Sequence, residues 1–206
     1  MERITAPQKL VNIMAHKTHT GDDAKLKELI LLLARKSEGD ENFGAVKLNK
    51  ELFYSDFLSY LHTGKSITGH EYIALERGPA PKYKTKIVDE MIKSHDLAIG
   101  KREAFGLVQD RAFALREPNL EKFTKDELLL IEHVLEHCHQ KSGKDLSDMS
   151  HLFIGWRLAA EKEVIPYCVA LVGTREPTLE EIGWGRELEP MAAGCLARNA
   201  ANTAEA

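Results

Sequence analysis

The chain has 206 residues, of which 43% are hydrophobic and 29% charged; this is the composition of a soluble globular protein and excludes wholesale disorder. The formal net charge of −4 provides no global positive field for nucleic-acid phosphates, so we expect no direct nucleic-acid partner. No apolar run approaches the ~20 residues that cross a bilayer, and the N-terminal residues lack a signal-peptide core, so we expect a cytoplasmic protein with no membrane partner.

The length favours one sizeable core. We divide the chain into an N-terminal extension (1–22), a helical domain (23–172) and a partly disordered C-terminal tail (173–206). A short helix is predicted over residues 7–16. Asp22 or Asp23 caps the next helix, in which apolar residues recur at helical spacing from Leu26 to Leu33. Residues 48–61 carry one wide apolar face, and Gly64 ends that helix because glycine enters the left-handed region without a Cβ clash.

A short alternating pattern over residues 71–76 predicts a strand, and Gly78-Pro79-Ala80-Pro81 predicts a rigid break after it. Residues 82–95 predict a helix. Residues 105–116 predict two short strands joined at 109–111, which form a small antiparallel sheet with residues 71–76. The expected fold class is therefore mainly α (α+β): a single helical domain with a small antiparallel β-sheet or hairpin, winged-helix-like in appearance.

The last part of the helical domain begins with Thr124 and Glu127, which form a capping box. The helix that they open carries Leu128 to Cys138 on one apolar face. Residues 147–150 predict the start of another helix that continues to about residue 162. Residues 164–172 are apolar enough to be buried, either extended or as a short helix after Pro166, and residues 178–181 form a further capping box.

A family resemblance rests on two separate groups of residues. The first group is Leu48-Asn49-Lys50, Phe53-Tyr54, Asp56, Gly64-Lys65, Thr68-Gly69, Tyr72, Leu75, Gly78-Pro79 and Pro81; the second is Leu146, Ser147, Ser150, His151 and Trp156. Together they resemble the SocA-like Panacea domain, over roughly residues 29–156. The resemblance implies an antitoxin, one of a family with phage-associated and prophage members, that binds and neutralises a cognate protein toxin encoded by an adjacent gene. It implies direct masking, chaperone-like holding or delivery to a cytoplasmic protease.

Most of the family-motif residues have a structural interpretation. Asp56 is expected to be a buried carboxylate that accepts hydrogen bonds from backbone amides or an arginine, and Asn49 to satisfy backbone groups near Gly69. His151, close to Trp156, is expected to fix the core geometry through a hydrogen bond, although a role in proton transfer is the sharper alternative. The remaining motif residues assigned a structural role are Tyr54, Gly78 and Pro79.

Partner contact requires only an exposed groove with aromatic and arginine anchors. The candidates are Tyr72, Arg77, Tyr83 and Arg102, from the predicted strand and its flanks. The chain lacks the helix-turn-helix that some family members carry at the N-terminus, so autoregulation through DNA binding is not expected.

Two alternatives remain. His133 and His137 lie four apart on a predicted helix, as zinc ligands do, so a metal-dependent hydrolase that uses them with His151 is one alternative. However, HVLEH lacks the glutamate that follows the first histidine in HExxH, and both imidazoles lie off the apolar face, so a solvated polar face is favoured. The three cysteines form no CxxC pair. We therefore expect no metal, no cofactor and no enzyme. The other alternative is a protease adaptor whose Ala-rich tail (192–206) is read as a degradation signal.

Overall fold

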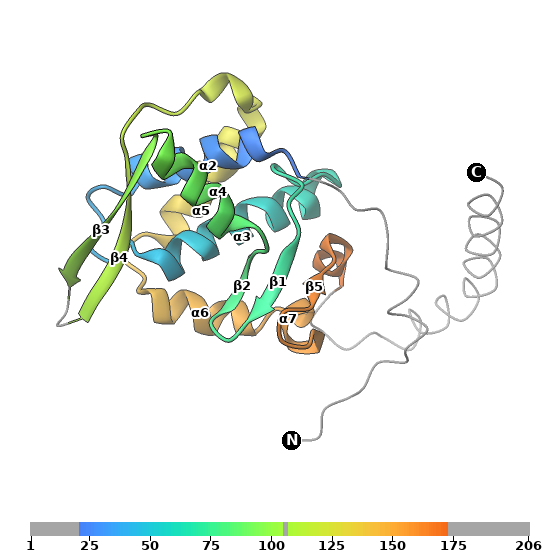
Figure 1. The fold of residues 1–206 in the computed structure, drawn as a ribbon. Coiled ribbons are helices and arrows are strands. Elements are labelled where there is room, and N and C mark those ends of the chain that lie inside the picture. The colour runs from blue at the N-terminus through green and yellow to red at the C-terminus, as the bar shows by residue number, and fades with distance from the viewer. Residues whose placement is uncertain (1–20, 105–106, 173–206) are drawn as a thin grey trace, which may run out of the picture. The chain divides into compact units, whose positions relative to one another are not determined.

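Helix α3 (Ala45–Thr63) lies at the centre of the described part of the chain (Figure 1). The structure is a computed structural model, and it describes residues 21–104 and 107–172. Helices α2 (Asp23–Lys36), α5 (Lys125–Cys138) and α6 (Gly143–His151) pack against α3. As predicted, α3 ends at Gly64, which has a left-handed φ of 73°. The mainly helical α+β class is confirmed.

Helix α2 is buried on nearly every side, which explains its long run of leucine and isoleucine. Asp22 caps it by accepting a hydrogen bond from the Lys25 amide, as predicted. The larger core cluster joins α2 to the start of α3, to α4 (Lys84–Lys93), to the hairpin of β3 (Leu97–Ala104) and β4 (Leu107–Ala114), and to α5. A second cluster of aromatic residues lies around the C-terminal half of α3.

Three short antiparallel strands form one sheet with the order β2-β1-β5. Strand β1 (Tyr72–Leu75) was predicted, and β5 (Val164–Ile165) is the extended part of the apolar segment 164–172. The prediction of a rigid break at residues 78–81 was wrong, because Gly78–Pro81 is strand β2, with Tyr72 opposite Pro81. An edge strand tolerates proline because one side of its backbone makes no ladder bonds.

The second sheet is the β3–β4 hairpin, which pairs Leu97 with Ala114 and Ala104 with Leu107. Two predictions were wrong here. Residues 109–111 do not join two strands but lie inside β4, and the hairpin shares no sheet with β1. The sequence of β3 does not read as a strand, because several of its residues are charged. They are tolerated because β3 forms one side of a projecting hairpin rather than a layer of the core.

The helices from α4 onwards partly match the prediction. Helix α4 was predicted, η1 (Leu120–Lys122) was not, and α5 begins with the predicted capping box of Thr124 and Glu127. The single helix predicted from residue 147 to 162 was wrong: a capping box of Ser142 and Asp145 starts α6, and α7 (Ile154–Leu158) follows. Residues 164–172 contain both predicted forms, β5 and then the turn η2 (Tyr167–Leu171).

Several predictions lie outside the described residues, namely the helix over 7–16, the capping box at 178–181 and the tail at 173–206. The division of the chain at residues 22 and 172 therefore stays a prediction. Among the helices of the described ranges, none combines the length and the apolar character that crossing a bilayer requires.

Candidate functional site

The two groups of family-motif residues meet at the turn between β1 and β2. Trp156 Nε1 donates a hydrogen bond to the Leu75 carbonyl at 2.8 Å, and Ser147 Oγ donates to the Arg77 carbonyl at 3.0 Å. The ammonium group of Lys50, on α3, donates to the Pro79 carbonyl at 2.9 Å. Side chains from α3, α6 and α7 thus bond the carbonyl groups of three alternate residues in and beside this turn, which fixes its position on the helical body.

Asp56 connects α3 to the chain that follows it. Its fully buried carboxylate accepts hydrogen bonds from the Thr68 amide at 2.7 Å, the Thr68 hydroxyl at 2.5 Å and the Tyr72 hydroxyl at 2.8 Å. This confirms the expectation of a buried carboxylate that accepts from a backbone amide, with hydroxyl groups in place of an arginine. Burial raises the pKa of Asp56, and the three donors oppose that rise.

The other motif residues give a mixed result. Asn49 does not bond the backbone near Gly69, because its Oδ1 is buried without a hydrogen-bond partner among the described residues; that expectation was wrong. The Tyr54 hydroxyl is likewise buried without a partner there, and burial raises its pKa. His151 stacks on Trp156 with ring centroids 3.8 Å apart, and its Nε2 lies 3.5 Å from Ser147 Oγ. Gly69 and Gly78 have φ angles of 70° and 92°, which favour glycine.

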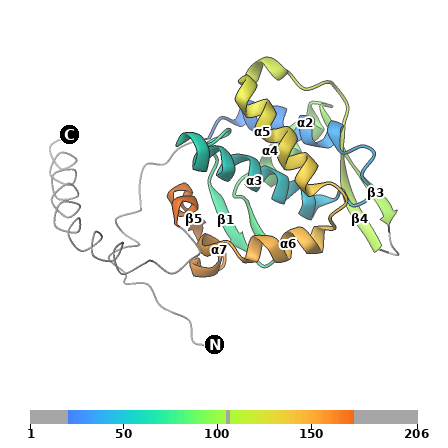
Figure 2. The ribbon, with the colours of Figure 1, turned by 180° about the vertical axis from the view of Figure 1, so that it is seen from behind.

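A groove of about 850 Å³ opens beside the β1–β2 turn. One wall is the first half of β4, at Val108, Gln109 and Asp110, and the other is formed by the first turns of α3 and α6, with Arg77 on the turn. In Figures 1 and 2, β4 is the strand of the hairpin nearer to these helices. The groove is therefore built from both family-motif regions and from the hairpin that lies between them in the sequence.

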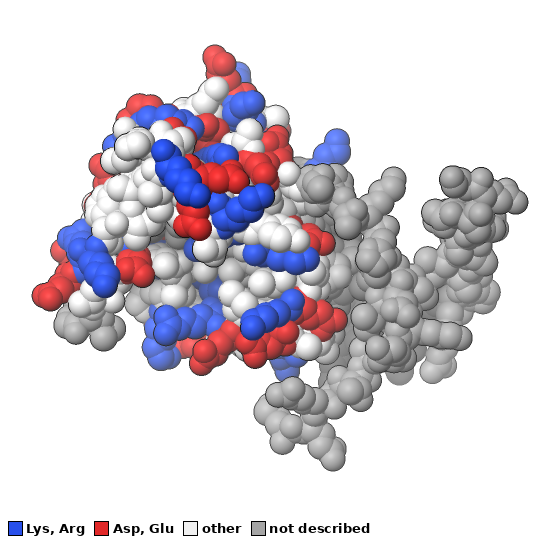
Figure 3. All heavy atoms as spheres, in the orientation of Figure 1, with Lys and Arg blue, Asp and Glu red and all other residues white. Residues whose placement is uncertain are grey.

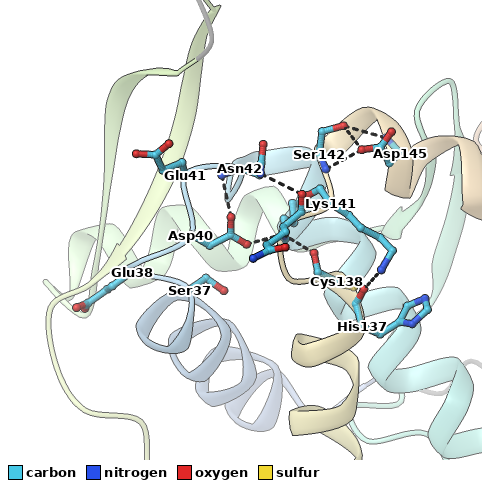
Figure 4. Close-up of polar contacts among 12 residues, drawn as sticks. Ser37, Glu38, Asp40, Glu41, Asn42, His137, Cys138, Lys141, Ser142 and Asp145 are labelled. Carbon is cyan, nitrogen blue, oxygen red and sulfur yellow. Dashed lines mark hydrogen bonds and ion pairs between the residues drawn. The ribbon is translucent and has the colours of Figure 1, made fainter.

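Buried cations make the wall of the groove rigid. Lys47 Nζ contacts the Asp40 carboxylate at 2.5 Å and the Cys138 carbonyl at 2.6 Å. Figure 4 shows how the loop after α2, with Asp40 and Asn42, faces the loop between α5 and α6; the side-chain Nδ2 of Asn42 donates to the Gln140 carbonyl at 3.3 Å. Charge-assisted bonds of this kind hold the two loops together.

Arg111 in turn holds the β3–β4 hairpin against the end of α2. Its guanidinium is 1% exposed and donates to the carbonyl groups of Ser37, Glu38 and Asp40 at 2.6–2.7 Å, at the end of α2. Phe43 and Phe113 lie beside the guanidinium, at 5.5 and 5.7 Å. The sequence analysis predicted neither Lys47 nor Arg111. Every residue has a backbone carbonyl group, so no residue pattern indicates which carbonyl groups a buried cation will bond.

The four predicted partner-contact residues do not form one patch. Tyr72 is 0% exposed and bonded to Asp56, so the interpretation of its side chain as a surface anchor was wrong. Arg77 is exposed and lines the groove. Tyr83 is 52% exposed beside α4, under the Lys82 ammonium, and Arg102 lies on β3 with a guanidinium nitrogen 3.7 Å from Glu41. Only Arg77 lines the groove.

The histidines of the hydrolase alternative lie on different helices. His133 and His137 are exposed on α5, whereas His151 stacks on Trp156 at the end of α6. Within residues 21–104 and 107–172, no three histidine, cysteine or carboxylate side chains are grouped so as to hold a metal ion. The face drawn in Figure 3 carries Lys and Arg interspersed with Asp and Glu, so that face has no field of one sign.

Glu51, one turn after Lys47, gives a testable dependence of stability on pH. Its side chain is 1% exposed, Oε2 has no hydrogen-bond partner among the described residues, and burial raises its pKa from 4.5 to about 8. The folded state therefore binds more protons than the unfolded state between these two values, so this group makes stability fall as pH rises from 4.5 to about 8.

We expect Glu51→Gln to reduce that fall by roughly 2–4 kcal/mol, because each pKa unit corresponds to about 1.4 kcal/mol. Urea unfolding followed by circular dichroism, repeated across this pH range, measures it. The matched control is Glu161→Gln, because Glu161 is exposed and makes no side-chain ion pair among the described residues. Equal pH profiles for wild type and Glu51→Gln would contradict the assignment.

Comparison with protein families gives a match. The model of the family described as "Antitoxin SocA-like, Panacea domain" matches residues 48–157, which is more than half of the chain. No curated protein and no solved structure matches. The matched range contains both motif groups and every residue of the β4 and α6 walls of the groove, together with Arg77.

Proposed function

Because the chain belongs to the family of SocA-like antitoxins with a Panacea domain, we propose that it binds a protein toxin encoded by the adjacent gene and neutralises it in the cytoplasm by masking or holding it. Binding, rather than catalysis, is the function of this domain in the proposal. The observation that supports it most is the groove, because residues from the two motif groups on which the family resemblance rests hold the turn that carries Arg77.

The chemistry of the groove supports a protein partner. Val46 and Val108 offer apolar contacts, Gln109 and Gln140 offer amide groups, and Arg77 is an exposed cation with no ion pair among the described residues. A mixed lining of this kind, with one arginine, matches the composition of protein interfaces. Asp110 and Asp145 also line it, which disfavours a phosphate backbone as the occupant.

Co-expression tests the proposal. Expression of the adjacent gene product alone is expected to arrest growth, and co-expression of this chain is expected to restore growth and to yield a complex that co-purifies. We expect Arg77→Glu to weaken the complex by roughly tenfold or more, because arginine at the centre of an interface is a common hot spot. Titration of the purified proteins measures the loss.

The matched control is Arg157→Glu, which makes the same change at an exposed arginine on α7 that does not line the groove. Equal losses for the two variants would show that net charge, not the groove, sets the affinity. Failure of wild type both to restore growth and to co-purify with the adjacent gene product would overturn the proposed function.

A further inference from the structure

The direction of the backbone groups along β4 follows from one hydrogen bond. The Leu115 amide donates to the Asp96 carbonyl at 2.9 Å, next to the first pair of the β3–β4 ladder. Bonded and non-bonded pairs alternate along an antiparallel ladder. With the observed register, Arg111 and Gln109 bond β3, so the backbone N–H and C=O groups of Val108 and Asp110 point away from β3.

The outer edge of β4 is exposed beside the groove. The second half of the strand is covered, because Ala112 and Ala114 are buried in the core cluster that contains α2. Val108, Gln109 and Asp110 instead line the groove, and Val108 is 62% exposed. Among the described residues β4 pairs with β3 alone, and the backbone N–H and C=O groups of Val108 and Asp110 have no hydrogen-bond partner there.

The wall of the groove opposite β4 carries side chains that a strand added to β4 would contact. Val46, on the first turn of α3, lines the groove together with Val108 on the β4 wall, and Arg77 lies on the β1–β2 turn. The first turn of α3 has no acidic residue, and its N-cap, Gly44, has no side chain to bond the free amides. An apolar side chain and an acidic side chain on the occupant would complement this wall.

We propose that the groove binds an extended segment of the partner protein as an additional strand on the Val108–Asp110 edge of β4. The segment places an apolar side chain between Val46 and Val108 and an acidic side chain at Arg77. Backbone bonds give such an added strand its affinity, and the side chains in alternate positions give its specificity. The outer edge of β3 presents Lys101 and Glu103 instead, the kind of charged residues that protect a free edge. This inference rests on the proposed function, of which it specifies the binding mode.

Proline scanning of the two edges tests the strand. Asp110→Pro removes a backbone N–H that points into the groove and leaves the β3–β4 ladder intact. Lys101→Pro is the matched control, because Lys101 is directly opposite Asp110 and its N–H points to the outer edge of β3. Each variant loses the same cross-strand pair, and thermal unfolding confirms that both fold.

The probe is a phage-displayed library of random linear peptides selected on the wild-type protein. We expect enriched peptides with an acidic and an apolar residue, which shift the amide resonances of Val108 and Asp110. Asp110→Pro is expected to lower the affinity for an enriched synthetic peptide by roughly tenfold or more, and Lys101→Pro to lower it by less than about twofold. Selection of no peptide, or equal losses for the two variants, would overturn the proposal.

The same variants separate this inference from the proposed function. If Asp110→Pro still neutralises the adjacent gene product as well as wild type does, strand addition at β4 is wrong while the antitoxin function stands. If wild type does not bind that product, the proposed function falls, and the peptide selection still decides whether the β4 edge accepts a strand.

Discussion

Replacing Asp56 with alanine is expected to lower the free energy of unfolding by about 3–5 kcal/mol, because the change leaves buried donors without an acceptor. The carboxylate is fully buried and accepts from the Thr68 amide, the Thr68 hydroxyl and the Tyr72 hydroxyl. Each buried donor left unsatisfied costs about 1–3 kcal/mol. The lost side chain also leaves space between α3 and β1 that the packed aromatic residues around it do not fill.

Chemical denaturation at neutral pH measures the effect as a shift of the unfolding midpoint. Asp89→Ala is the control, because Asp89 is exposed on α4 and its side chain makes no hydrogen bond among the described residues; we expect a change within about 0.5 kcal/mol. Asp56→Asn should fall between the two, because its amide oxygen keeps one acceptor and its NH₂ group opposes the remaining donors. A loss below about 1 kcal/mol for Asp56→Ala would show that the network does not hold α3 to β1.

The central helix and its buried carboxylate could be predicted because their causes are local. The spacing of apolar residues marks α3, Gly64 marks its end, and Asp56 lies on the face that packs against the following strand. The capping box of Thr124 and Glu127 is equally local and was predicted, whereas that of Ser142 and Asp145 was missed because aspartate takes the place of glutamate. Local signals therefore place most of the helices.

The hairpin and the groove could not be predicted, because their causes are not local. Arg111 reads as a surface residue in the sequence, yet it is buried against carbonyl groups more than seventy residues away in the chain. Tyr72 was predicted as a partner-contact residue on the predicted strand, yet β1 is the central strand of its sheet and Phe53 and Phe57 cover the ring. Which face of a short strand is covered depends on what packs there, and the alternation pattern alone does not specify it.

Alanine substitutions at Gly78 and Gly64 can be compared, because both impose a similar backbone strain but the space around the two positions differs. Both have left-handed φ angles, 92° and 73°. A Cβ atom at Gly78 would overlap Ser150 Oγ and lie 2.6 Å from Lys50 Nζ, whereas nothing lies within 4 Å of a Cβ atom at Gly64. Lys50 is 1% exposed and bonded to the Pro79 carbonyl, so its side chain has little room to move. The turn that presents Arg77 depends on this close approach.

We expect Gly64→Ala to cost about 1 kcal/mol, the strain of a left-handed non-glycine residue. Gly78→Ala should cost about 3 kcal/mol or more, because it adds a displacement of the buried Lys50 side chain and of its bond to the Pro79 carbonyl. Urea unfolding of both variants measures the difference in stability, and binding of the adjacent gene product at a temperature where both remain folded measures the consequence for the groove. Weaker binding by Gly78→Ala than by Gly64→Ala would show that the position of the turn sets the position of Arg77. Equal stabilities would mean that the turn shifts without cost, and that the contacts of Lys50, Ser147 and Trp156 do not fix it.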